Sequence, residues 1–159
     1  MFSHTNENGE ASMVDITAKP HSQREAIATG RIKLAPATLE LIRQNEIQKG
    51  DVLAVARIAG IQAAKQTQHL IPLCHQIALT KVSVDFIVTH EGVCATATAL
   101  TVSQTGVEME ALTAVSVALL TVYDMCKAVD KSMHIEGIHL VSKSKKATEA
   151  YHLSEATHK

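Results

Sequence analysis

Apolar and polar residues alternate with a period of two in several parts of the chain, and this period predicts β-strands. The clearest alternation covers Val82–Val88 and then Val93–Val102. Glu91-Gly92 stands between them as a turn, so these two strands are predicted to pair as a hairpin. A further strand is predicted over Arg24–Leu34, and a last one over Met133–Ser142.

A helical pattern fills the segments between these strands. Pro36 suits the first turn of a short helix over Ala37–Asn45. Asp51 is a favourable N-cap for a longer helix to about Gln68, and Pro72 follows as a stop. This second helix carries small residues that permit close approach of another backbone: Ala54, Ala56, Ala59, Gly60, Ala63 and Ala64.

The longest apolar segment runs from Val107 to Val129 and contains neither Gly nor Pro, which favours a helix. Apolar residues occupy almost every side of its middle turns. A helix of this kind is buried on several faces, which is more burial than one sheet provides.

The order strand, two helices, two strands, helix, strand is typical of an α+β ferredoxin-like sandwich, with an antiparallel sheet and helices on one face. The uncovered sheet face and the apolar last helix together predict an oligomer. The length of 159 residues suits one domain. We expect this domain at 13–146, between a flexible N-terminal segment 1–12 and a flexible C-terminal tail 147–159.

Composition narrows the functional classes. Hydrophobic residues make up 46% and charged residues 19%, which supports a packed core, and the net charge of −1 argues against general nucleic-acid binding. Three widely spaced cysteines indicate reduced thiols. Met1–Asn8 has no apolar signal-peptide core, and the longest candidate apolar stretch, Leu112–Met125, is shorter than a membrane span. We therefore expect a soluble, cytoplasmic protein with no membrane or nucleic-acid partner.

The string Leu73-Cys74-His75, between Pro72 and a strand, is the first candidate site. The pair could act as a thiol nucleophile, as metal ligands or as a functional histidine, or it could be a buried thiol beside a hydrogen-bonded histidine. Zinc ligands come in spaced pairs, and only His69 lies nearby, so no metal is expected.

Two carboxylates, Glu108 and Glu110, follow Gly106 at the start of the long helix. Interaction with the helix dipole explains them adequately. The functional alternative is that one carboxylate binds the guanidine-like edge of a purine or pterin through two hydrogen bonds.

Charged residues return at the end of the long helix, where Asp124 and Lys127 share a helix face. On the surface such an ion pair would contribute little. If partly buried, it could form an acid–base pair in which the lysine titrates nearer neutrality. Four basic residues elsewhere could meet phosphates, or could be solvated: Lys49, Arg57, Lys65 and Lys143.

Several long strings resemble the cyclic pyranopterin monophosphate synthase family of molybdenum-cofactor biosynthesis. They are KGDV (49–52), ARIAGIQAAK (56–65), LIPLCH (70–75), TGVEMEALT (105–113), YDMCKAV (123–129) and the early MVDIT (13–17). The resemblance covers roughly residues 9–146. It implies a ferredoxin-like fold and a homohexamer, a trimer of dimers, with sites at dimer interfaces. The implied reaction converts (8S)-3′,8-cyclo-7,8-dihydroguanosine 5′-triphosphate to the pyranopterin and releases diphosphate, without a required cofactor, although Mg²⁺ can accompany the triphosphate.

Matched residue by residue, the resemblance implies catalytic roles for Asp124 and Lys127. It implies substrate contacts for Leu73, Cys74, His75, Met109, Glu110, Lys49, Lys65 and Lys143. Gln76 stands where relatives often have Pro, which predicts a less constrained loop around His75. The alternative class is a ligand-binding module without catalysis, which would bind the nucleotide unchanged.

Overall fold

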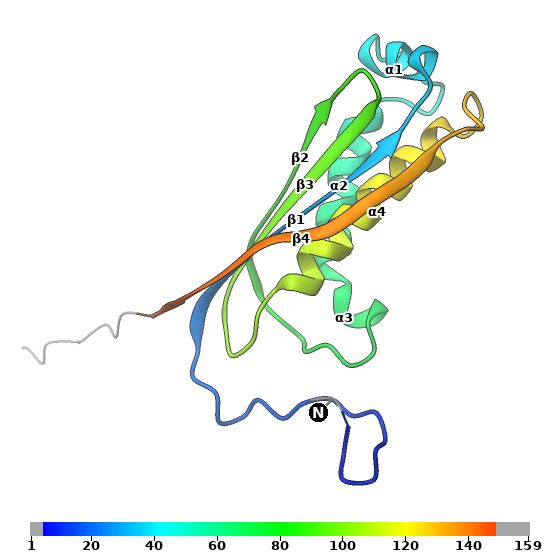
Figure 1. The fold of residues 1–159 in the computed structure, drawn as a ribbon. Coiled ribbons are helices and arrows are strands. Elements are labelled where there is room, and N and C mark those ends of the chain that lie inside the picture. The colour runs from blue at the N-terminus through cyan, green and yellow to red at the C-terminus, as the bar shows by residue number, and fades with distance from the viewer. Residues whose placement is uncertain (1–4, 149–159) are drawn as a thin grey trace, which may run out of the picture.

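The computed structural model describes residues 5–148. The element order is β1 (Ser22–Lys33), α1 (Pro36–Arg43), α2 (Val52–Lys65), α3 (Thr67–Leu70), β2 (Leu79–Val88), β3 (Gly92–Ser103), α4 (Glu108–Cys126) and β4 (His134–Ala147). The predicted α+β class is confirmed, as are the predicted strands, the two earlier helices and the long last helix (Figure 1).

The four strands form one antiparallel sheet in the order β2-β3-β1-β4. The predicted hairpin is β2–β3, in which Val88 pairs with Val93. Its turn is closed by a hydrogen bond from Thr89 N–H to the carbonyl of Gly92 at 2.8 Å. A Cβ on Gly92 would overlap the carbonyl oxygen of Ile32 on β1, so only glycine fits where the hairpin meets the neighbouring strand.

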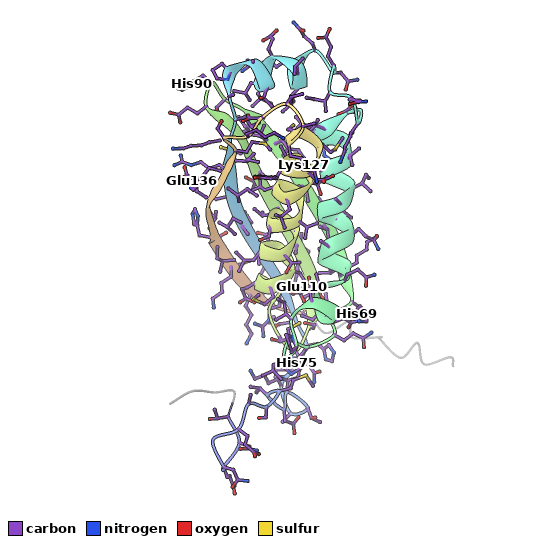
Figure 2. All side chains as sticks on the ribbon, turned by 90° about the vertical axis from the view of Figure 1, so that its right-hand side faces the viewer. His69, His75, His90, Glu110, Lys127 and Glu136 are labelled. Atoms are coloured by element: carbon purple, nitrogen blue, oxygen red, sulfur yellow. The ribbon has the colours of Figure 1, made fainter. Side chains whose placement is uncertain are left out.

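Helices α2 and α4 cover one face of the sheet (Figure 2). Among the small residues expected to allow close approach, Gly60 does so: a Cβ there would lie 2.9 Å from the carbonyl oxygen of Ala114. Ala54, by contrast, is exposed. Alanines are also frequent on the inward faces of α2, α4 and β3. All of the following are fully or almost fully buried: Ala56, Ala64, Ala111, Ala114, Ala118, Ala95, Ala97 and Ala99.

Several predicted boundaries are wrong by a few residues. β2 begins at Leu79 rather than Val82, and α1 ends at Arg43 rather than Asn45. α2 ends at Lys65, because the Thr67 hydroxyl donates to the carbonyls of Ala63 and Ala64 and a separate turn, α3, begins there. The long helix is Glu108–Cys126 rather than 107–129, and the last strand runs five residues past Ser142.

The structure describes only part of the two chain ends that were predicted to be flexible. Thr5 and Ala11 form an isolated β-bridge within the predicted N-terminal segment, and Ala147 still belongs to β4. Residues 1–4 and 149–159 lie outside the described residues, so flexibility of both ends stays a prediction.

Helix α4 is long and apolar enough to cross a membrane when up to two charges are allowed, which corrects the expectation that no such segment exists. It is nevertheless the central helix of this domain, and 56% of its apolar window is buried inside the chain. Its outer surface keeps Leu120 and Tyr123 exposed, beside Val55 and Ile58 of α2. Within residues 5–148 no helix or strand covers the sheet face away from the helices. The bare sheet face and the apolar outer side of the last helix, both expected from the sequence, are therefore present.

Candidate functional site

Three adjoining hollows surround the first turn of α4, and we call them together the basin. The largest, about 310 Å³, is lined on one side by Leu73, Cys74 and His75 and on the other by Met109 and Glu110. A second, about 110 Å³, shares His75 and Glu110 and adds Lys65. A third, about 270 Å³, lies beyond Gly106 and Glu108 and is lined by Lys143. The basin thus brings together seven of the ten residues singled out from the sequence: Leu73, Cys74, His75, Met109, Glu110, Lys65 and Lys143.

The loop between α3 and β2 holds the Leu73-Cys74-His75 string in place. The Cys74 thiol lies 3.8 Å from the carbonyl of Thr67, and its amide donates to the carbonyl of Ile71. At the far end of the loop the Thr101 hydroxyl donates to the carbonyl of Ala78 at 2.7 Å. Both ends of the loop are therefore fixed to neighbouring elements.

The His75 ring is held from outside the loop: its Nε2 lies 2.6 Å from the carbonyl oxygen of Val14. A carbonyl only accepts, so Nε2 carries the proton in this contact. When the imidazole is neutral, Nδ1 is therefore its acceptor. Its surroundings include Gln76 and Lys65 in the second hollow.

Glu110 is the buried acid of the basin and is only 4% exposed. Burial raises the pKa of its carboxyl to about 7, and the nearby Glu108 charge acts in the same direction. The pKa of the Cys74 thiol is raised by burial and by the Glu110 charge, so Cys74 is not an activated nucleophile. Glu110 can exchange a proton near neutral pH, or accept two N–H groups of a ligand that stabilises its ionised form.

Glu108 is oriented differently, with its carboxylate folded back over the start of the helix. A Cβ on Gly106 would overlap this carboxylate, so the Glu108 side chain passes directly over Gly106 and would have to move if the glycine were replaced. Lys143 of β4 approaches Glu108 Oε1 at 3.6 Å. This contact ties the end of the sheet to the first turn of α4 and holds a cation at the basin.

The other three predicted residues form a separate cluster at the far end of α4. Lys49 Nζ donates to Asp124 Oδ2 at 2.7 Å, and Lys127 Nζ lies 2.9 Å from Asp124 Oδ1. The predicted pairing of Asp124 with Lys127 on one helix face is confirmed. About half of each side chain is exposed.

Partial burial, the condition under which Lys127 was expected to titrate nearer neutrality, is not met in this chain. The hydrogen bond to Asp124 raises the pKa of Lys127. Hydrogen bonds from Lys49 and Lys127 lower the pKa of Asp124 to about 2. The reason is exposure: without burial, attraction between opposite charges dominates, so both groups stay ionised at neutral pH.

The turn after α4 that carries Lys127 is held by Asp130, a carboxylate that is 4% exposed. Its Oδ2 accepts from the Ala35 amide and the Thr38 hydroxyl, and its Oδ1 accepts from the Ser132 amide and hydroxyl. Burial alone would raise the pKa of Asp130, but these hydrogen bonds lower it. Asp130 therefore joins the start of α1 to the end of α4.

The basin and the cluster lie at opposite ends of one helix, as Glu110 and Lys127 show in Figure 2. The fourteen residues from Glu110 to Asp124 correspond to about 21 Å along the helix axis. An acid–base group must lie within about 3 Å of the proton that it transfers. Basin and cluster of one chain therefore cannot act together on the same reacting atoms.

Sequence reasoning missed several residues of the basin. Lys19, Val14 and Ile16 line its largest hollow, and Arg24 lines the third. The MVDIT string pointed to this N-terminal segment but gave it no role. Conversely Arg57, considered as a phosphate ligand, donates to the carbonyl of Val84 on β2, away from both groups.

No group of three or more His, Cys, Asp and Glu side chains within residues 5–148 is arranged to hold a metal ion. His69, the only histidine near Cys74 and His75 in sequence, lies instead beside Gln68, 3.2 Å from its side-chain nitrogen.

Comparison with known proteins bears on the same segments. The model of the MoaC family matches residues 13–146. A cyclic pyranopterin monophosphate synthase of Thermomicrobium roseum is 56% identical over 145 residues, which cover 90% of this chain and 87% of the relative. One of Novosphingobium aromaticivorans is 57% identical over 142 residues, covering 89% of this chain and 90% of the relative.

A longer relative contains a second part. The molybdenum cofactor biosynthesis bifunctional protein of Chlorobaculum tepidum is 52% identical over 153 residues. The match covers 95% of this chain and 49% of that protein, so this chain spans about half the length of the bifunctional relative.

Proposed function

The chain belongs to the MoaC family, and from that premise we propose that it is a cyclic pyranopterin monophosphate synthase of molybdenum-cofactor biosynthesis. It converts (8S)-3′,8-cyclo-7,8-dihydroguanosine 5′-triphosphate to cyclic pyranopterin monophosphate and releases diphosphate. The observation that carries the proposal is the composition of the basin, in which a buried carboxylate, a histidine and two lysines surround one concave surface.

The basin suits the heterocycle and phosphates of this substrate. Glu110 offers a desolvated carboxylate, and the guanidine edge of a purine or pterin presents two N–H groups to it. Binding these donors favours the ionised form of Glu110. Leu73 and Met109 offer apolar contact to the rings, and His75, Lys65 and Lys143 offer donors and charge to phosphate oxygens.

The cluster suits proton transfer and charge neutralisation. Asp124 is an ionised base and Lys127 a protonated acid, held 2.9 Å apart. Opening the five-membered ring and forming the six-membered one requires proton transfers at nitrogen and carbon, and a positioned acid–base group contributes about 10²–10⁴-fold. Lys49 supplies a further cation to the leaving diphosphate. If a substrate phosphate draws either Lys49 or Lys127 away from Asp124, the second lysine still pairs with the carboxylate.

The complete site is built from two chains, with the basin of one facing the cluster of the other. Two observations support this arrangement: the separation of about 21 Å along α4 within a chain, and the exposed apolar residues of α2 and α4, Val55, Ile58, Leu120 and Tyr123, which need cover. The assembly is a homohexamer, a trimer of such dimers, in a cytoplasmic enzyme. The sheet order β2-β3-β1-β4 supports the ferredoxin-like assignment of the fold.

The enzyme needs no resident cofactor in this proposal. Mg²⁺ enters, where it does, as a companion of the triphosphate, whose oxygens it prefers. The lysines around the basin, Lys19, Lys65 and Lys143, would face such a complex. They neutralise the part of the phosphate charge that Mg²⁺ does not neutralise.

Supplying the cyclised dihydro-GTP to the purified protein tests the function. Diphosphate and a pterin should appear in equal amounts, and heat-denatured protein should release neither. Binding of the nucleotide without any diphosphate would assign the chain to the ligand-binding class instead.

A further inference from the structure

Residues Val14–Lys19 form a strap along the edge of the largest hollow, to which Val14, Ile16 and Lys19 contribute. In Figure 1 the N-terminal segment runs past the end of the sheet below α3. The strap belongs to no helix or strand. Its position on the basin therefore depends on contacts made by other parts of the chain.

Side chains from two elements hold the strap. His75 Nε2 meets the carbonyl of Val14 at 2.6 Å. The Gln104 side chain, just after β3, donates from Nε2 to the carbonyls of Thr17 at 3.2 Å and Lys19 at 3.0 Å. A primary amide has two N–H groups on one nitrogen, so a single glutamine can hold both carbonyls.

The strap is ordered by its own residues as well. Asp15 Oδ1 accepts from the Thr17 amide at 2.8 Å and from the Thr17 hydroxyl at 2.6 Å, and these bonds lower the pKa of Asp15. The Lys19 amide donates to the carbonyl of Ile16 at 2.9 Å. These local bonds make a preformed turn that moves as a unit. The Gln104 side chain is hydrogen-bonded to the Thr17–Lys19 end of this turn.

We propose that Gln104 is a positioning residue of the substrate site: it clasps the strap onto the basin, and the clasped strap holds the Lys19 ammonium at the basin and the His75 ring in its Nε2–H form. The ligand that benefits is a phosphorylated heterocycle, because the strap adds the Lys19 cation to the largest hollow and fixes the imidazole of His75, which lines both this hollow and the one that contains Lys65. This inference rests on the proposed function for its kinetic part only.

The clasp acts on binding rather than on chemistry. If the strap is seated for only part of the time, the apparent dissociation constant rises as the inverse of the seated fraction. Asp124 and Lys127 do not touch the strap, so the chemical step keeps its acid–base pair. Loss of the clasp should therefore raise KM and leave kcat almost unchanged.

Hydrogen exchange on the free protein tests the clasp directly. Gln104→Met keeps the length of the side chain and removes both N–H donors. Amide protons of residues 14–19 should exchange faster in Gln104→Met than in the wild type, while β1 and α4 keep their protection. Gln44→Met is the matched control, because Gln44 also donates from Nε2, to Glu40 on the distant helix α1. Gln104→Lys, which retains donors, should keep most of the strap's protection.

The kinetic counterpart is a rise in KM of about three- to tenfold for Gln104→Met, with kcat within about twofold. Unchanged exchange at 14–19 in Gln104→Met, or a fall in kcat at constant KM, would overturn the proposal. Because exchange is measured without substrate, it tests the clasp even for a protein that releases no diphosphate. Hydrogen exchange therefore reports on the clasp, and diphosphate release reports on the proposed function, so the failure of one can be told from the failure of the other.

Discussion

Lys49 and Asp124 are 75 positions apart in the chain, yet Lys49 Nζ donates to Asp124 Oδ2 at 2.7 Å. The loop before α2 thus adds a second cation to the carboxylate that already faces Lys127 at 2.9 Å. One carboxylate organises two ammonium groups on an open surface. In the proposed two-chain site, these two ammonium groups face the phosphates of a substrate held in the basin of the other chain.

Lys127→Ala should reduce turnover by about 10²-fold or more, equivalent to roughly 2.7 kcal/mol in the barrier, because one acid–base group is lost. Sedimentation and nucleotide binding should stay close to those of the wild type. Lys49→Ala should act differently and chiefly weaken binding of the triphosphate. The control is Lys81→Ala, which removes an exposed lysine from β2.

Steady-state kinetics with the cyclised substrate, beside sedimentation, measures both effects. Near-normal turnover in Lys127→Ala, or turnover lost only together with the oligomer, would assign the ion pair a structural role.

Asp124→Asn should shift the pH at which Lys127 loses its proton. The Asp124 carboxylate raises the pKa of Lys127, so the neutral amide should let that pKa fall. If protonated Lys127 is the acid, the alkaline limb of the kcat profile should move to lower pH in the variant, on top of a lower maximum. An alkaline limb that stays in place would show that another group sets it.

Glu110→Gln should change how stability depends on pH. The pKa of Glu110 is about 7 in the folded chain and 4.5 in its ordinary state. The folded state therefore binds more protons between these values, and stability falls as pH rises from about 4.5 through 7. The side-chain amide of the variant does not titrate, so the fall attributable to this residue, up to about 3 kcal/mol, should vanish.

Urea unfolding at pH 5 and pH 8, at one protomer concentration, measures this difference. All other titrating groups are common to both proteins, so only the wild-type minus variant difference matters. An equal difference at both pH values would mean that Glu110 titrates normally.

The sequence predicted most of the fold because period-two alternation and helix signals are local. The small-residue surface of α2 also showed where α4 would approach, as Gly60 against Ala114 confirms. Helix ends were less accurate, because Thr67 ends α2 through hydroxyl bonds to carbonyls three and four residues earlier, and no N-cap or proline marks that point.

The resemblance named candidate site residues, but their arrangement could not be predicted from the sequence. Resemblance named Glu110, His75, Asp124 and Lys127 together, whereas the distance along α4 separates them into two groups. The charge state of Lys127 depended on exposure, which periodicity does not give for a residue at a helix end. The Gln104 contact to the strap joins segments 85 or more residues apart, so no local pattern indicates it.

The last prediction tests the proposal that the site is divided between two chains. Glu110→Gln removes the basin's buried acid, and Lys127→Ala removes the cluster's acid. In a dimer made of one variant only, both sites contain the substituted residue and are damaged. In a mixed dimer, one site contains both lesions, while the other combines the intact basin of one chain with the intact cluster of its partner. Unfolding and refolding the two inactive variants together should therefore restore activity.

Random pairing of equal amounts makes half of the dimers mixed, and half of their sites intact, so recovery should approach about a quarter of wild-type activity. Separately refolded variants, combined without exchange of chains, give the background. Glu110→Gln refolded with Glu110→Gln/Lys127→Ala is the second control, because no intact pairing exists there. If each chain held a whole site, mixing would add nothing to the sum of the parts. Recovery near a quarter, and only after chain exchange, would place the basin and the cluster of every working site on different chains.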